Sequence, residues 1–165
     1  MPELSWEDGA KGRTVILREG LIASLPEALP APGWEEFELL STERALADAP
    51  GALREAAAAV HLVEPGKVSD VSAAILDMVG EANLVALGGG RVVDAAKAIA
   101  SVRGTEVAAV PTTLSGAPMT AIHMLPAGQA GVSGTRPALV LADPEAMTSA
   151  EEEQLRATAM NAVAH

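Results

Sequence analysis

The feature that most constrains this fold is the stretch "LVALGGGRVVDAAKAIA" at residues 84–100. An apolar run is followed by three glycines and then by an alanine-rich segment. The run predicts a buried strand at residues 84–87, and the segment predicts a helix at residues 92–100. A strand that turns directly into a helix is the repeating unit of parallel sheets, so this stretch favours an α/β fold.

The rest of the chain repeats the same alternation. Apolar and β-branched runs predict further strands at residues 14–17, 38–40, 60–63, 107–110 and 138–141. Helical patterns lie between or after them, at residues 21–29, 53–59, 68–79 and from 151 to the end. Runs such as "LVAL" and "ALVL" lack polar alternation, as expected of strands that are buried on both faces. We therefore predict a mostly parallel sheet with helices on both faces.

Composition excludes several classes of partner. A length of 165 residues fits one domain with its own core, and aromatic residues make up only 2% of it. The net charge of −11 argues against binding to nucleic acid. The absence of cysteine excludes disulfides, thiolate nucleophiles and Cys-ligated zinc, and it fits a cytoplasmic location. No signal peptide and no apolar stretch long enough to span a membrane is recognisable.

The three glycines at residues 88–90 follow the carboxyl end of a predicted strand, which is where a parallel α/β sheet binds its ligand. The first N–H groups of the following helix lack partners, and Gly88, Gly89 and Gly90 have no Cβ to keep a phosphate away. The loop is either a pyrophosphate site or a tight turn that binds nothing. Asp94 and Lys97 share one helix face, either as a solvated ion pair or with Asp94 facing a ligand and Lys97 reaching a phosphate or carboxylate.

A second polar loop, "PTTLSGAPMT", follows the strand predicted at residues 107–110. Thr112, Thr113 and Ser115 supply hydroxyl groups that either bind a nucleotide or cap their own loop. Because the carboxyl ends of parallel strands share one edge, the two loops are expected to lie together. Their combination favours a binding site.

Together the two loops resemble those of the iron-containing (group III) alcohol dehydrogenases and their dehydroquinate-synthase-like relatives. In that family a "GGGS-x-x-D-x-A-K" loop binds the pyrophosphate of NAD(P), and "GGGRVVDAAK" stands here. The family's "PTT" loop binds the nicotinamide side of the cofactor, and its next strand ends in "DP", matched here by Asp143 and Pro144. The resemblance implies a Rossmann-like nucleotide-binding domain at residues 1–148 with NAD or NADP as cofactor. It implies cofactor contacts from Gly88, Gly89, Gly90, Asp94, Lys97, Thr112, Thr113 and Ser115.

Departures from the common family pattern point to one branch. The short "PTTLSGAPMT" loop and the terminal "MNAVAH" resemble the maleylacetate reductases. The metal-dependent branch reads "DALTH" at this place, and its Asp and His are metal ligands. Asn161 replaces that Asp here, and an amide is a poor substitute for a carboxylate ligand, so the sequence argues against a divalent metal. The resemblance makes His165 a catalytic residue and Asn161 a substrate contact.

Arg91 replaces the Ser that usually follows the three glycines in the family, and it either contacts a cofactor phosphate or points to solvent.

The resemblance also implies a longer enzyme. The family continues with a helical domain that supplies most of the substrate pocket, and residues 149–165 are predicted as its first helix, with Ser149 as N-cap. The expected reaction is hydride transfer to or from an enol or keto acid, a small organic acid, and we expect this chain alone to be inactive. The alternatives are a metal-dependent alcohol or glycerol dehydrogenase domain and a nucleotide-binding module without turnover. An apolar surface left by a missing domain would favour a homodimer.

The choice between NAD and NADP depends on the segment "LLSTERA". A carboxylate such as that of Glu43 would accept hydrogen bonds from the adenosine ribose and favour NAD. Thr42 and Arg44 would instead suit a 2′-phosphate and favour NADP. From the sequence we favour NAD with Glu43 as the ribose ligand, and either cofactor is compatible.

Overall fold

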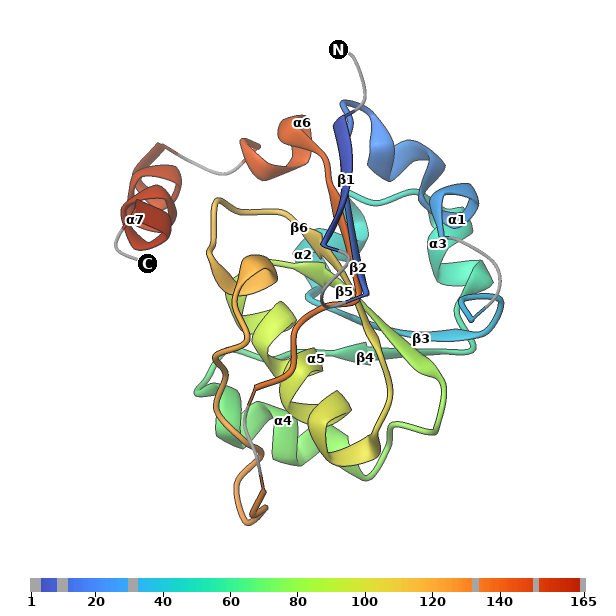
Figure 1. Ribbon diagram of the computed structural model, residues 1–165, viewed down its shortest axis with the longest axis vertical. Coiled ribbons are helices and arrows are strands. Elements are labelled where there is room, and N and C mark those ends of the chain that lie inside the picture. Colours follow the sequence, from blue (N-terminus) through green and yellow to red (C-terminus); the bar gives the residue numbers. More distant parts are fainter. Residues whose placement is uncertain (1–3, 9–11, 30–32, 132–133, 150–151, 164–165) are drawn as a thin grey trace.

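The computed structural model describes residues 4–8, 12–29, 33–131, 134–149 and 152–163. Its strands form one sheet in the order β1-β2-β7-β6-β5-β3-β4 (Figure 1). All neighbouring strands are parallel except β1, which pairs antiparallel with β2 at one edge. The strands are β1 (Leu4–Asp8), β2 (Arg13–Leu17), β3 (Phe37–Ser41), β4 (Ala59–Leu62), β5 (Asn83–Gly88), β6 (Val107–Pro111) and β7 (Leu139–Ala142). The predicted α/β fold with a mostly parallel sheet is confirmed.

Helices cover both faces of this sheet, and each face has its own apolar core. Neighbouring strand residues point to opposite faces, so Leu40 packs with residues of α4 and α5, whereas Leu39 packs with Leu25 of α1 and Leu53 of α3. The core on the α4–α5 face is entirely aliphatic, whereas the core on the other face also contains Trp34 and Phe37. The helices are η1 (Leu21–Ser24), α1 (Leu25–Ala28), α2 (Glu43–Ala47), α3 (Gly51–Ala56), α4 (Val68–Leu76), α5 (Gly90–Arg103), η2 (Ala117–Met119), α6 (Pro144–Met147) and α7 (Glu152–Val163).

Several predicted boundaries are wrong for identifiable reasons. The helix predicted at 53–59 ends at Ala56, and the N–H of Ala58 donates to the carbonyl of Phe37, so pairing with β3 overrides the helical propensity of alanine. The helix predicted at 68–79 ends at Leu76, although Val79 beyond its end is buried. The segment 21–29 divides into η1 and α1, and the short elements β1, α2 and α6 were not predicted.

The predicted C-terminal helix is present as α7, which is described from Glu152 onward. The Ser149 hydroxyl donates to the carbonyl of Ala146, 2.9 Å away. Residues 150–151 lie outside the described ranges, so the predicted N-cap role of Ser149 stays a prediction. None of the helices in the described ranges has the length and apolar character that crossing a bilayer requires.

The carboxyl ends of β3, β5 and β6 lie next to one another. Ser41 is aligned with Leu87, and Gly88 with Pro111. The Ser41 hydroxyl donates to the carbonyl of Leu87 at 2.8 Å, and the N–H of Thr112 donates to the carbonyl of Gly88 at 3.0 Å. These bonds bring the segments after the three strands to one edge of the sheet, as the sequence predicted.

Candidate functional site

A cavity of about 940 Å³ opens at this edge of the sheet. Its size is in the upper range of small-molecule sites. It is bordered by the segments that follow β3, β5, β6 and β7, the places where an open α/β sheet binds its ligands. Among its lining residues are Thr42, Arg44, Gly89, Gly90, Thr112 and Thr113.

The glycine loop is a tight turn, and part of it also lines the cavity. A Cβ on Gly88 would lie 2.6 Å from Cγ2 of Val92, and a Cβ on Gly90 would lie 2.5 Å from Oγ of Ser115. Packing therefore favours glycine at both positions, more strictly at Gly88, where the Cβ of Val92 is also only 2.9 Å away. Gly89 and Gly90 also line the cavity, and Gly89 is the N-cap of α5 without any side-chain cap. The first N–H groups of α5 are thus at the wall of the cavity, where they suit an anion.

Thr113 is the second feature that indicates a ligand. Its side chain is buried and lines the cavity, yet Oγ1 has no hydrogen-bond partner among the described residues. A buried hydroxyl without a partner costs free energy, and a bound polar ligand would supply the missing bond. The neighbouring Ser115 behaves differently, because its Oγ accepts from the N–H of Ala117 at 3.1 Å. Ser115 caps its own loop and does not line the cavity.

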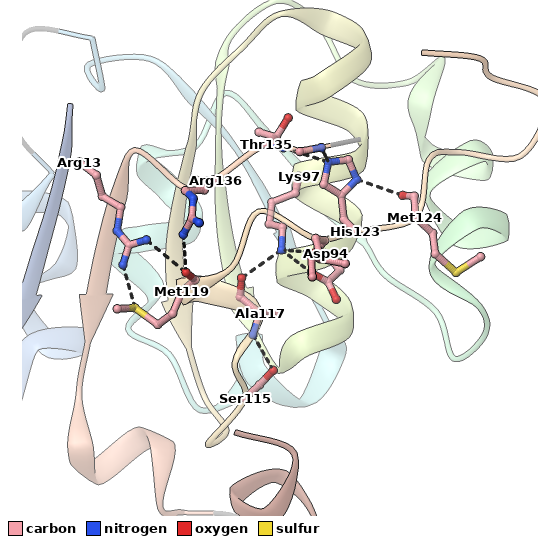
Figure 2. A network of polar contacts seen from close by, with 12 residues as sticks. Arg13, Asp94, Lys97, Ser115, Ala117, Met119, His123, Met124, Thr135 and Arg136 are labelled. Atoms are coloured by element: carbon pink, nitrogen blue, oxygen red, sulfur yellow. Dashed lines mark hydrogen bonds and ion pairs between the residues drawn. The ribbon is translucent and has the colours of Figure 1, made fainter. Parts of the chain in front are cut away.

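Lys97 is fully buried, and its ammonium group has three protein acceptors (Figure 2). Nζ donates to Oδ1 of Asp94 at 2.7 Å, to the carbonyl of Ala117 at 3.0 Å and to that of Ile122 at 2.8 Å. Burial lowers the pKa of Lys97 below its usual range, and the bond to Asp94 partly opposes this effect. The Asp94–Lys97 pair exists, but it is not the solvated pair that one alternative assumed.

Neither member of this pair lines the cavity. The contacts of Lys97 attach the segment 117–122 to α5, which is a structural role. Contact of Asp94 or Lys97 with a cofactor stays a prediction that this geometry does not support.

His123 lies in the same network and was not singled out by its sequence (Figure 2). Its Nε2 accepts from the N–H groups of Gly134 at 3.1 Å and Thr135 at 3.2 Å, and Nδ1 lies 3.2 Å from the carbonyl of Met124. These partners require a neutral ring with the proton on Nδ1. Burial is the main cause that lowers the pKa of His123, and the positive charge of Lys97 acts in the same direction. The sequence does not indicate that this histidine joins the segments around Met124 and Thr135, because a single histidine in a loop belongs to no recognisable motif.

Asp143 shapes the rim of the cavity through the backbone. Its buried carboxylate accepts from the N–H groups of Gly20 at 3.3 Å, Ile22 at 3.1 Å and Glu145 at 3.1 Å. It thereby caps α6 and holds the turn before η1. The sequence identified this residue only as a landmark, although an Asp-Pro pair directly after a strand is a recognisable N-cap signal.

The remaining predicted site residues lie elsewhere. Glu43 is exposed at the start of α2 and does not line the cavity, whereas Thr42 and Arg44 do. Asn161 belongs to α7, but its side chain and all of His165 are outside the described residues. Within the described ranges, no group of three or more His, Cys, Asp or Glu side chains could hold a metal ion. The predictions about Asn161, His165 and the metal therefore stay predictions.

Comparison with known proteins identifies the family of this chain. Residues 17–150 match the model of a protein family described as iron-containing alcohol dehydrogenase. The chain belongs to this family. It is a family of oxidoreductases, so the resemblance seen in the two loops is confirmed.

Maleylacetate reductases are among the similar members of the family. Over 86 residues the chain is 42% identical to maleylacetate reductase 2 of Cupriavidus pinatubonensis (strain JMP 134 / LMG 1197), a match that covers 50% of this chain and 24% of that protein. The crystal structure of maleylacetate reductase from Agrobacterium tumefaciens superposes with a TM-score of 0.78 at 25% identity, over 100% of this chain and 49% of that one. The reductase from Rhizobium sp. strain MTP-10005 gives a TM-score of 0.71 at 24% identity, over 92% and 45%. The chain thus spans about half the length of these solved relatives.

Proposed function

We propose that this chain binds NAD(P)H in the cavity at the carboxyl edge of its sheet and forms the cofactor-binding part of a reductase similar to maleylacetate reductase. The observation that carries the proposal is the buried Thr113 hydroxyl, which has no hydrogen-bond partner among the described residues and lies next to Gly89 at the N-terminus of α5. The glycine backbone would hold the pyrophosphate, and Thr112 and Thr113 would bind the nicotinamide-side ribose. The cofactor, when bound, supplies the hydride.

Within this proposal the chain's own residues bind and orient the cofactor. The domain would comprise residues 1–148, and α7 would begin a helical part that holds Asn161 and His165. The reaction would transfer hydride to or from an enol or keto acid. We expect the 165-residue chain to bind the cofactor without turning over such a substrate, because most of the substrate pocket would lie in that helical part.

A matched pair of threonine variants tests cofactor binding. Thr113 and Thr105 both bury a hydroxyl oxygen that has no partner among the described residues, but only Thr113 lines the cavity. Thr113→Val and Thr105→Val should each leave stability unchanged or slightly higher, since each removes a buried polar group without a partner. Titrations of NADH and NADPH, followed by nicotinamide fluorescence, should show about tenfold weaker binding for Thr113→Val alone.

The outcomes separate the alternatives. Failure of both dinucleotides to bind a folded wild-type chain would refute the proposal. Equal affinity in wild type and Thr113→Val would exclude Thr113 from the site. Turnover of an alcohol or of glycerol that depends on added metal would favour a metal-dependent dehydrogenase, and binding by a complete protein that lacks all turnover would favour a nucleotide-binding module.

A further inference from the structure

The two sides of the cavity differ in charge. Thr112 and Thr113 follow β6 on one side of the glycine loop, and Thr42 and Arg44 follow β3 on the other side. Arg91, in the first turn of α5, also lines the cavity. Two guanidinium groups therefore border one cavity in a chain whose net charge is −11. A small anion with more than one phosphate group is the ligand that this arrangement suits.

Arg91 is difficult to explain by the stability of its own helix. The N-terminus of α5 carries partial positive charge, so a cation in the first turn is unfavourable there. Among the described residues no hydrogen bond or ion pair of its side chain stabilises the fold. A bound anion between this guanidinium and the N–H groups of the helix would turn an unfavourable placement into a favourable one.

The carboxylates at the cavity do not offer an equally good site for a ribose hydroxyl. Both oxygens of Asp143 already accept backbone N–H groups. Glu43 does not line the cavity. Asp48, at the C-terminal end of α2, and Glu145 of α6 are both exposed and line the cavity. Glu145 follows β7, on the side of the sheet away from β3, so Asp48 is the carboxylate that competes with Arg44 for the sugar.

We propose that Arg44 and Arg91 make this cavity select NADPH over NADH, by binding the 2′-phosphate of the adenosine ribose. This inference rests on the proposed function. It places the adenosine on the β3 side of the cavity, because the 2′-phosphate is attracted to the two arginines there. The uncharged side with Thr112 and Thr113 then remains for the nicotinamide ribose. It also reverses the preference for NAD that Glu43 suggested from the sequence.

Binding titrations with matched arginine variants test the inference. Arg44→Gln and Arg91→Gln remove one charge each, and Arg54→Gln serves as control because Arg54 is exposed on α3 and does not line the cavity. Dissociation constants for NADPH and NADH are measured at two salt concentrations, with 2′,5′-ADP and ADP as competing ligands. Thermal melting of each variant confirms that it is folded.

The wild-type chain should bind NADPH about tenfold more tightly than NADH, and added salt should reduce this ratio. Arg44→Gln should bring the ratio towards one while leaving NADH affinity nearly unchanged. Arg91→Gln should weaken both cofactors, because Arg91 also borders the pyrophosphate position. Arg54→Gln should change neither constant.

Two results would overturn the inference while leaving the proposed function intact. One is equal or tighter binding of NADH by the wild type, above all if Asp48→Asn then weakens NADH. The other is an unchanged NADPH preference in Arg44→Gln and Arg91→Gln. If a folded wild-type chain binds neither dinucleotide, the proposed function itself fails.

Discussion

Replacement of Lys97 by methionine should destabilise the fold by about 3 kcal/mol. The substitution keeps the length of the buried side chain and removes its ammonium group. The carbonyls of Ala117 and Ile122 then lose their donor, at a cost of about 1–3 kcal/mol each. Asp94 contributes less, because its side chain is 28% exposed and water can replace the lost bond. Removal of the buried ammonium group also removes the free-energy cost of its desolvation, and this gain offsets part of the lost hydrogen-bond energy.

Urea unfolding followed by circular dichroism measures this change. Lys67→Met is the matched control, because Lys67 is an exposed lysine at the N-cap of α4, and it should change the free energy of unfolding by less than about 0.5 kcal/mol. Hydrogen exchange should also become faster in residues 117–124 of Lys97→Met, since the segment loses its attachment to α5.

Lys97→Met with wild-type or higher stability would refute the reasoning, because the desolvation of the ammonium group would then equal or exceed its hydrogen bonds. Cofactor titration provides a second readout. A structural role requires that folded Lys97→Met retain its affinity for NADPH. Strong loss of affinity in the folded variant would instead support the cofactor contact implied by the family resemblance.

Three further predictions concern other contacts. Because the pKa of His123 is lowered in the fold, the unfolded chain binds more protons below about pH 6.5, and urea midpoints should fall as the pH is lowered through that value; His123→Phe should flatten this slope. Gly90→Ala should lower the melting temperature despite the higher helix propensity of alanine, because its Cβ would lie 2.5 Å from Oγ of Ser115, and Ser115→Ala should partly restore it. Asp143→Ala should cost about 2–4 kcal/mol in urea unfolding, since three N–H groups lose their acceptor, whereas an unchanged midpoint would show that water replaces the carboxylate.

Much of the sheet was predictable because its strands are continuous apolar runs. The runs around Leu84 and Val107 lack polar alternation and lie between turn residues, which is typical of strands buried on both faces of a sheet. The elements that were missed are short. The strand β1 has an exposed Leu4 and Ser5 and no long apolar run, and its pairing with β2 is a long-range choice that local pattern does not encode.

The candidate site was predictable in its loops and less so in its side chains. Gly89, Gly90, Thr112 and Thr113 line one cavity because register places the ends of β5 and β6 together. The same local reasoning chose Glu43 over its neighbours, and the structure places Glu43 outside the cavity lining. Which side chain of a short helix faces a cavity depends on how that helix packs, which spacing along the chain does not determine.

The sequence by itself determined the class of fold, the edge at which the loops meet and the family, because these depend on periodicity and on glycine, threonine and proline at fixed spacings. Only the tertiary structure decided what the charged groups do. The carbonyls of the segment 117–122 hold the buried Lys97, and the pKa of His123 is lowered chiefly because its ring is buried, where the N–H groups of Gly134 and Thr135 donate to it. Burial and hydrogen bonding act on an ionisable group through residues far away in the chain, so its charge state and role become visible only when those residues are brought together.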